Sequence, residues 1–271
     1  MGRVSILRAM LLGLAVGHAA AAAAAPPPDP LKSPMWDFMV DQLFGDDPVR
    51  FDDRVRVVMP EIAEDQRAFP VAVDARAIAG VKRIVIFADL NPIQRAIDYR
   101  LADADAYVAT RIKLDQRTPV RGAVQLEDGS WLVGGAWIDA AGGGCSAPPV
   151  SRVKGDWAKH LGEVRARAWA QAGGAKVQMA FRHPMDTGFV DNIGAYHIET
   201  ISLKGSDGRV LGVVAMQASV AEDPLLTLIP HARAGEVLRL DGVDTNGIAY
   251  AGAIPVPAAS GPAAGGGGAA R

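Results

Sequence analysis

Short runs rich in valine, isoleucine and aromatic residues recur along the chain and are separated by turn-forming residues. In the first half, these runs cover residues 54–59, 69–73, 81–88, 106–114, 120–126 and 131–138. The pair Asp128-Gly129 stands between two of them, and this dipeptide favours a hairpin. Because no amphipathic helix separates the runs, they predict an antiparallel sandwich and not an α/β fold.

The second half repeats this pattern. Runs at residues 177–181, 196–204, 210–220, 225–229, 236–241 and 248–254 predict a second small sandwich. Residues 163–169 could form a helix, because alanine and arginine favour helices. We prefer a strand there, because Val164, Ala166 and Ala168 fall on one side at a spacing of two.

Glycines and prolines at residues 142–155 interrupt the strand pattern. The sequence therefore predicts a boundary there, between one sandwich at residues 51–141 and another at 156–257. Residues 26–50 contain a proline-rich spacer and a short helix, in which Ser33 is the cap, Pro34 the first residue and Gly45 the end. The glycine-rich residues 258–271 are predicted to be disordered.

The first 25 residues are typical of a cleavable signal peptide, with Arg3 and Arg8 ahead of an apolar run and a block of alanines. That run, residues 9–16, is too short to span a membrane. The sequence thus predicts export to the periplasm without membrane insertion. With 28 basic and 30 acidic residues, the chain shows no excess positive charge that would favour nucleic acid.

Cys145 is the only cysteine, so it cannot form a disulfide within the chain. Most cysteines are buried and inert. The flanking residues favour a different interpretation, because Gly142, Gly143 and Gly144 precede it and prolines follow. A flexible arm that exposes a nucleophilic thiol fits this stretch better than a core position.

Other candidate sites are weaker. His183 and Asp186, in HPMDTG, could bind a metal, but a loop of defined backbone geometry fits better because no second histidine lies at ligand spacing. Asp103 and Asp105 suggest a solvated loop and not a carboxylate pair. The histidines His160, His197 and His231 are scattered, and the sequence cannot pair any of them with Cys145. No phosphate or dinucleotide fingerprint is present, so we expect no cofactor. We also expect no metal, because the histidines lack ligand spacing.

Several segments together resemble a known carrier family. MPEIAEDQRAFPVAV, FADLNP, YVATRIKLDQRTPVRGAV and the glycines before Cys145 resemble the SoxY subunit of the sulfur-oxidation carrier. FRHPMDTG and IETISLKG resemble its partner subunit SoxZ. The matches extend from about residue 51 to residue 254, in the order of a SoxY-SoxZ fusion of the group linked with quinoprotein dehydrogenases.

This resemblance implies two immunoglobulin-like β-sandwich domains in tandem, preceded by the short helix. It also implies a non-enzymatic periplasmic carrier that holds a sulfur intermediate covalently on Cys145, with Gly142, Gly143 and Gly144 as the flexible arm. Sulfur-oxidation enzymes or a quinoprotein dehydrogenase would be the partners. In separate SoxY chains the arm ends the chain, whereas Ser146 to Pro149 follow here. An arm tethered at both ends cannot enter a narrow tunnel end-first, which puts the usual thiosulfate-oxidation partners in doubt.

Two other functions fit the sequence. The chain could be a non-catalytic assembly module of a periplasmic quinoprotein alcohol dehydrogenase system, with Cys145 incidental. It could also be a thiol enzyme acting alone, which requires a general base near the sulfur.

Overall fold

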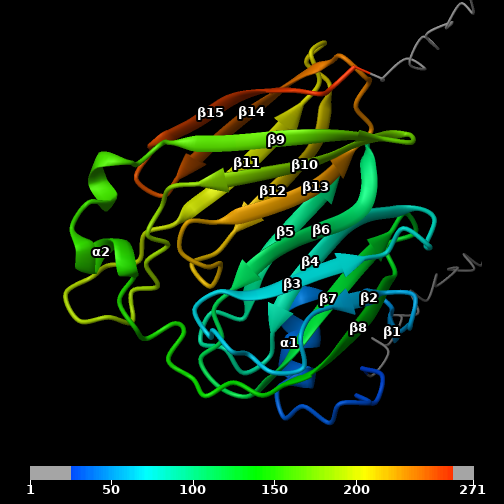
Figure 1. Ribbon diagram of the computed structural model, residues 1–271. Coiled ribbons are helices and arrows are strands. Elements are labelled where there is room, and N and C mark those ends of the chain that lie inside the picture. The colour runs from blue at the N-terminus through cyan, green and yellow to red at the C-terminus, as the bar shows by residue number, and fades with distance from the viewer. Residues whose placement is uncertain (1–25, 259–271) are drawn as a thin grey trace, which may run out of the picture.

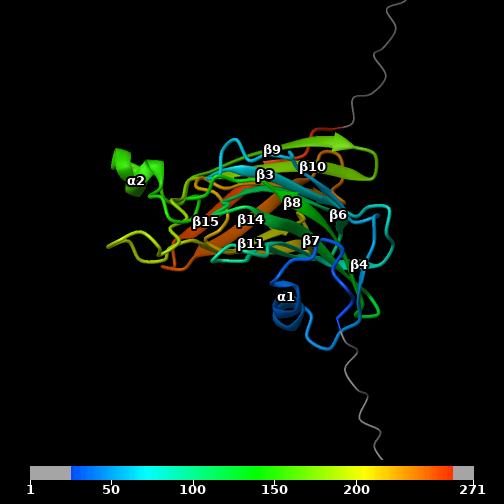
Figure 2. The same cartoon turned by 90° about the horizontal axis from the view of Figure 1, so that it is seen from below.

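The computed structural model describes residues 26–258, which form two packed β-sheets (Figures 1 and 2). One sheet has nine strands in the order β1-β8-β7-β4-β5-β12-β11-β14-β15, and the other has six in the order β2-β3-β6-β13-β10-β9. The predicted all-β sandwich fold is confirmed. The predicted signal peptide and residues 259–271 of the predicted tail lie outside the described residues.

The first half of the chain supplies one helix and eight strands. They are α1 Trp36–Leu43, β1 Val49–Phe51, β2 Arg56–Val58, β3 Phe69–Asp74, β4 Val81–Ala88, β5 Arg95–Leu101, β6 Ala104–Ile112, β7 Thr118–Leu126 and β8 Trp131–Ile138. The second half supplies α2 Val150–Lys154, η1 Trp157–Lys159, β9 Val164–Gln171, β10 Gly174–Phe181, β11 Ile198–Lys204, β12 Val210–Met216, β13 Leu225–Pro230, β14 Val237–Asp244 and β15 Ala249–Pro255. In the residues that the structure describes, no helix is long and apolar enough to cross a membrane.

The predicted strands are present, and two further strands appear. β9 confirms the strand that we preferred over a helix. The hairpin between β7 and β8 is also confirmed, with Gly129 at a φ of 86° that glycine adopts readily. β1 and β5 were not predicted, because β1 is only three residues long and charged residues interrupt the apolar pattern of β5.

Both sheets continue from the first half of the chain into the second. β5 pairs antiparallel with β12, and β6 pairs antiparallel with β13. A single apolar cluster fills the space between the sheets and includes Ile86 and Val108 from the first half with Val214 and Leu228 from the second. The two halves are therefore joined by backbone hydrogen bonds in both layers and by a common core.

The N-terminal segment covers the outer face of the nine-stranded sheet. Trp36 and Phe44 of the α1 region pack on Phe87 and Trp131, in a second apolar cluster outside the main core. The predicted start of this helix was wrong by two residues, because Ser33 and Pro34 lie in a turn before it, where Ser33 accepts the amide hydrogens of Met35 and Trp36. Helix α1 therefore begins at Trp36, two residues after Pro34.

A buried ion pair fixes the same segment to the sheet. Arg121 of β7 is fully buried and hydrogen-bonds to Asp89 and Asp29, with its guanidinium 4.7 Å from the ring centroid of Trp36. Asp29 lies 92 residues away from Arg121 in the sequence. The paired carboxylates compensate the burial of a guanidinium that would otherwise be very costly.

We predict that the described part of the chain unfolds as one cooperative unit, because neither half can expose its edge without breaking both sheets. Urea unfolding followed by tryptophan fluorescence and by far-ultraviolet circular dichroism should give coincident transitions. Leu228→Ala, in the second half of the core, should destabilise the fold by about 2–5 kcal/mol and shift both signals together. Two separated transitions would contradict a shared core.

Candidate functional site

Residues 142–149, here called the Cys145 segment, connect β8 to α2. Gly142 and Gly143 have φ angles of 102° and 84°, which favour glycine. Gly144 is required for a different reason, because a Cβ atom there would lie 2.3 Å from the carbonyl oxygen of Gln66 and 2.5 Å from that of Leu114. The glycines let this segment turn and pack closely against the first half of the chain.

The thiol of Cys145 is buried, with 1% of the residue exposed. The backbone amide of Cys145 donates a hydrogen bond to Asp115 Oδ1 at 3.0 Å, and Ser146 donates its amide and hydroxyl hydrogens to the same oxygen. Its carbonyl oxygen accepts the hydroxyl hydrogen of Thr187 at 2.6 Å. Asp115 and Thr187 belong to different halves, so the Cys145 segment is held between them.

The expectation of an exposed thiol is therefore wrong for the described structure. The physical reason is that glycine permits close backbone approach as well as flexibility. Here Gly144 donates its amide hydrogen to the carbonyl of Leu114 at 3.1 Å, and Leu114 donates to Gln66 at 2.7 Å. Satisfied backbone groups of this kind let a glycine-rich stretch lie in a buried position.

Lys113 forms a buried cation beside this segment. Its ammonium donates to the carbonyl oxygens of Met185, Ala218 and Val220, at 2.5, 2.7 and 3.0 Å. Burial lowers the pKa of Lys113 to about 8, and the negative charge of a Cys145 thiolate would raise it. Sequence reasoning missed this residue, whose only signal was a lysine between the apolar Ile112 and Leu114.

Burial and charge act in opposite directions on the thiol. Burial raises the pKa of Cys145 to about 12, while the positive charge of Lys113 lowers it and the negative charge of Asp115 raises it. In this position the thiol is protonated at neutral pH. Reaction through a thiolate therefore requires that the surroundings of the sulfur change.

The HPMDTG motif forms the loop that supports the Cys145 segment from the second half. The carbonyl oxygen of Met185 accepts a hydrogen bond from the Lys113 ammonium, and the hydroxyl of Thr187 donates to the carbonyl oxygen of Cys145. Asp186 is buried and forms an ion pair with Arg152 of α2. Met185 has a φ of 50°, which is uncommon for a residue other than glycine. The motif is thus a loop of defined backbone geometry, as the sequence suggested.

His183 of this motif is committed to the loop. Its Nδ1 accepts the amide hydrogen of Met185 at 2.8 Å, and its Nε2 lies 3.6 Å from Asp244 Oδ2 without a hydrogen bond. Burial lowers the pKa of His183 to about 3. Within residues 26–258, no group of three or more histidine, cysteine or acidic side chains could hold a metal ion.

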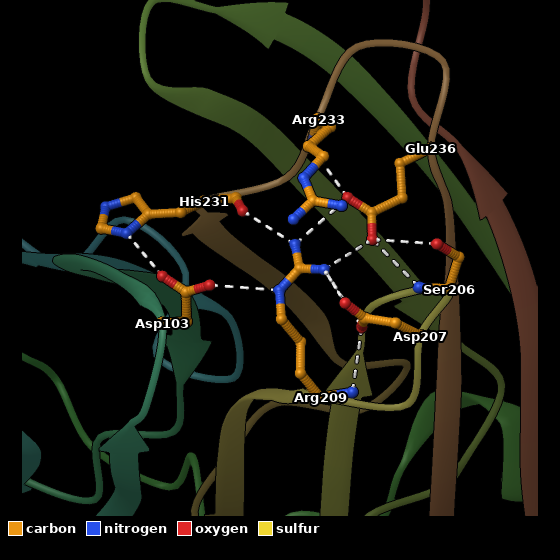
Figure 3. Close-up of polar contacts among 7 residues, drawn as sticks. All are labelled: Asp103, Ser206, Asp207, Arg209, His231, Arg233 and Glu236. Atoms are coloured by element: carbon orange, nitrogen blue, oxygen red, sulfur yellow. Dashed lines mark hydrogen bonds and ion pairs between the residues drawn. The ribbon is translucent and has the colours of Figure 1, made fainter.

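The other candidate residues lie elsewhere. His231 faces Asp103 through Nδ1 and Asp105 through Nε2, each at 2.9 Å, and the hydrogen bond to Asp105 is the largest cause that raises the histidine pKa. Figure 3 shows Asp103 between His231 and Arg209, which also pairs with Glu236. These carboxylates join the two halves and are more than a solvated loop. No hydrogen bond of Cys145 or Lys113 in the described chain involves a histidine.

The fold and the site together define a two-sheet β-sandwich protein whose single thiol is held between its halves. Residues 40–145 match the family model described as "Sulfur oxidation protein SoxY". The matched region ends on Cys145, so this residue and its three glycines belong to the SoxY-like part of the chain. No curated protein matches.

Solved structures also match this chain, and three of them are described here by identity, coverage and TM-score. The sulfur carrier protein SoxY from Chlorobium limicola f thiosulfatophilum is 21% identical, with 39% of this chain and 91% of that chain covered and a TM-score of 0.36. The Ig1-Ig2 part of Dpr2 in complex with DIP-Theta is 9% identical, with 74% and 96% covered and a TM-score of 0.22. A glycosyl hydrolase family 2 member from Bacteroides cellulosilyticus is 10% identical, with 70% and 24% covered and a TM-score of 0.21. Because every TM-score is below 0.5, the family match is the comparison that bears on function.

We predict that Gly144→Ala dislodges the Cys145 segment, because the added Cβ would overlap the carbonyls of Gln66 and Leu114. The rate of native labelling by a chromogenic disulfide reagent should rise by about tenfold or more, the factor that corresponds to about 1.4 kcal/mol. Gly194→Ala is the matched control, because its Cβ would meet no atom within 4 Å. Equal labelling rates in the two variants would show that Gly144 does not hold the segment.

The raised pKa of Cys145 predicts a pH dependence. Native alkylation by iodoacetamide should stay slow at neutral pH and accelerate as the pH approaches about 12, whereas the unfolded protein should follow an ordinary thiol pKa of about 8.5. The folded value lies above the unfolded one, so the stability contributed by the neutral thiol is present below the unfolded pKa and is lost as the pH rises through the folded pKa. Cys145→Ala should lack this loss, and rapid native alkylation near pH 8 would contradict the buried position.

Proposed function

We propose that this protein is a non-enzymatic carrier that holds a sulfur species covalently on Cys145 and presents it to partner enzymes. The observation that carries this proposal is the SoxY family match, which ends on the only cysteine of the chain. The SoxZ-like motif HPMDTG supports a fused SoxY-SoxZ arrangement, because its loop contacts the segment that bears Cys145.

In this mechanism the observed position of the Cys145 segment, in which the thiol is buried, is a resting position from which the thiol is released. The segment is held by a few hydrogen bonds, to Leu114, Asp115 and Thr187, and none of its residues belongs to a strand. A neutral hydrogen bond contributes about 0.5–1.5 kcal/mol and one to a charged group about 1.5–3 kcal/mol. Release requires these hydrogen bonds to break and the thiol to leave its buried position, and it leaves both sheets intact.

The covalent step requires an electron acceptor. Joining the Cys145 thiol to a second thiol-type sulfur forms one S–S bond and releases two protons and two electrons. A partner redox enzyme, of the sulfur-oxidation or quinoprotein dehydrogenase type, would accept these electrons. Lys113 would provide a positive charge beside the sulfur whenever a thiolate or an anionic adduct occupies the resting position.

The N-terminal sequence supports a periplasmic location, reached through a cleavable signal peptide. A second function is a non-catalytic assembly module for a periplasmic quinoprotein dehydrogenase system. The burial of Cys145 favours this alternative, because an incidental cysteine would also be buried. If Cys145→Ala retains full function in the host, the assembly module is correct and the carrier is wrong.

The carrier predicts a reductant-labile adduct. Protein isolated from the periplasm of its host during growth on reduced sulfur should carry a mass increase that dithiothreitol removes and that Cys145→Ser abolishes. Gly194→Ala should retain the adduct, because a Cβ atom there meets no atom within 4 Å. The absence of any such adduct from the unaltered protein would overturn the proposed function.

A further inference from the structure

The outward face of the six-stranded sheet has an unusual charge balance. Its strands contain five basic residues, and all five are exposed without an ion pair or side-chain hydrogen bond to any residue in the described part of the chain. They are Arg56, Arg111, Arg165, Arg167 and Lys176. The same strands contain two acidic residues, and both have partners: Asp74 pairs with Arg76, and Asp105 pairs with His231. This face therefore carries uncompensated positive charge.

Strand register places these cations around a floor of small side chains. Ala72 of β3 lies opposite Ala109 of β6, and Ala109 lies opposite Thr227 of β13. On the next strands of the sheet, Gln178 of β10 lies opposite Thr227, and Arg167 of β9 lies opposite Gln178. The row crosses from the first half of the chain to the second without a bulky side chain at its centre.

A shallow pocket follows this row. Its walls include apolar side chains and two of the cations: Val58, Met59, Tyr107, Leu225, Arg111 and Lys176. At the edge of the sheet, Lys176 lies opposite Trp169, and the guanidinium of Arg167 lies 5.0 Å from the ring centroid of Trp169. Exposed arginine, tyrosine and tryptophan side chains are the residues that most often dominate binding energy at protein interfaces.

One segment on the opposite side of the molecule is acidic. Residues 37–53 contain most of α1, on the outer face of the nine-stranded sheet, and the edge strand β1, and they include six aspartates and one cation, Arg50 (Figure 2). The whole chain has a formal net charge of −2. The positive face is thus a local feature and does not follow from a basic composition.

We infer that the outward face of the six-stranded sheet docks an acidic surface of a partner protein. Carboxylates of the partner would pair with Arg111, Lys176 and Arg167, and its apolar side chains would contact the walls of the pocket. Charge complementarity of this kind orients partners and accelerates their association. A protein fits better than a phosphate polymer because Val58, Met59 and Leu225 offer apolar contacts that a phosphate backbone would not use.

The position of this face relates docking to the site. Arg111 lies opposite Pro70 and two residues before Lys113. The next residue, Leu114, accepts the amide hydrogen of Gly144, which is adjacent to Cys145. The pocket therefore extends toward the strand ends where the Cys145 segment is held. Figure 1 shows α2, which follows this segment, beyond one end of the six-stranded sheet. The inference does not depend on what Cys145 carries, and it can fail or succeed separately from the proposed function.

The test uses the full described chain and a synthetic peptide in which glutamate alternates with leucine. In nuclear magnetic resonance titrations, amide shifts should change in β6, β10 and β13, and added salt should weaken binding. Arg111→Glu combined with Lys176→Glu should raise the dissociation constant about tenfold or more, a factor that corresponds to about 1.4 kcal/mol. Arg100→Glu combined with Arg239→Glu is the matched control, because both residues are exposed cations of the nine-stranded sheet.

Each outcome has one interpretation. Loss of binding in the first double variant, with a folded spectrum and with the control unaffected, supports the inference. No binding by the native protein, or equal binding by both double variants, overturns it. Tighter binding of single-stranded DNA than of the peptide would identify a polyanion site and also overturn it, as would self-association that the same variant abolishes. Cys145→Ser should bind the peptide as the native protein does.

Discussion

The pairing of β5 with β12 and of β6 with β13 is the constraint on which the rest of this structure depends. Each pair joins one half of the chain to the other, so the two layers and the core between them are common to both halves. The position of Cys145 follows from this arrangement, because Asp115 follows β6 and Thr187 follows β10. A relative shift of the halves would separate these two hydrogen-bonding partners. The same seam places the small side chains of β3, β6 and β13 in one row on the outer face.

The strands themselves were largely predictable, because β-branched and aromatic residues between turn-forming residues are a local signal. Val164, Ala166 and Ala168 identified β9 against the competing helix. β5 escaped prediction because Arg95, Asp98 and Arg100 interrupt its apolar pattern. Asp98 is nevertheless buried, since Arg83 of the neighbouring strand compensates its charge at 2.6 Å. Such pairing depends on strand order, which the sequence of β5 alone does not contain.

The site was predictable in its central residue and not in its surroundings. Cys145 stood out because it is the only cysteine and follows three glycines. The residues that hold it, Asp115 and Thr187, and the nearby cation Lys113 are 30 or more positions away in the sequence, and they become its neighbours only through the shared sheets. Glycine also has two structural uses, flexibility and close approach, and the letters do not distinguish them. At Gly144 the structure shows close approach.

The tethering of the Cys145 segment at both ends limits how far its sulfur can travel. Cys145 lies five residues before Val150, where α2 begins, and α2 is anchored through the ion pair of Arg152 with Asp186. A fully extended chain spans at most about 3.4 Å per residue, so Cys145 cannot move more than about 17 Å from Val150 while α2 stays in place. Any enzyme that reacts with the thiol must bring its own reactive group within this radius. The catalytic centre of such an enzyme must therefore lie near its surface, in an opening wide enough to admit a loop.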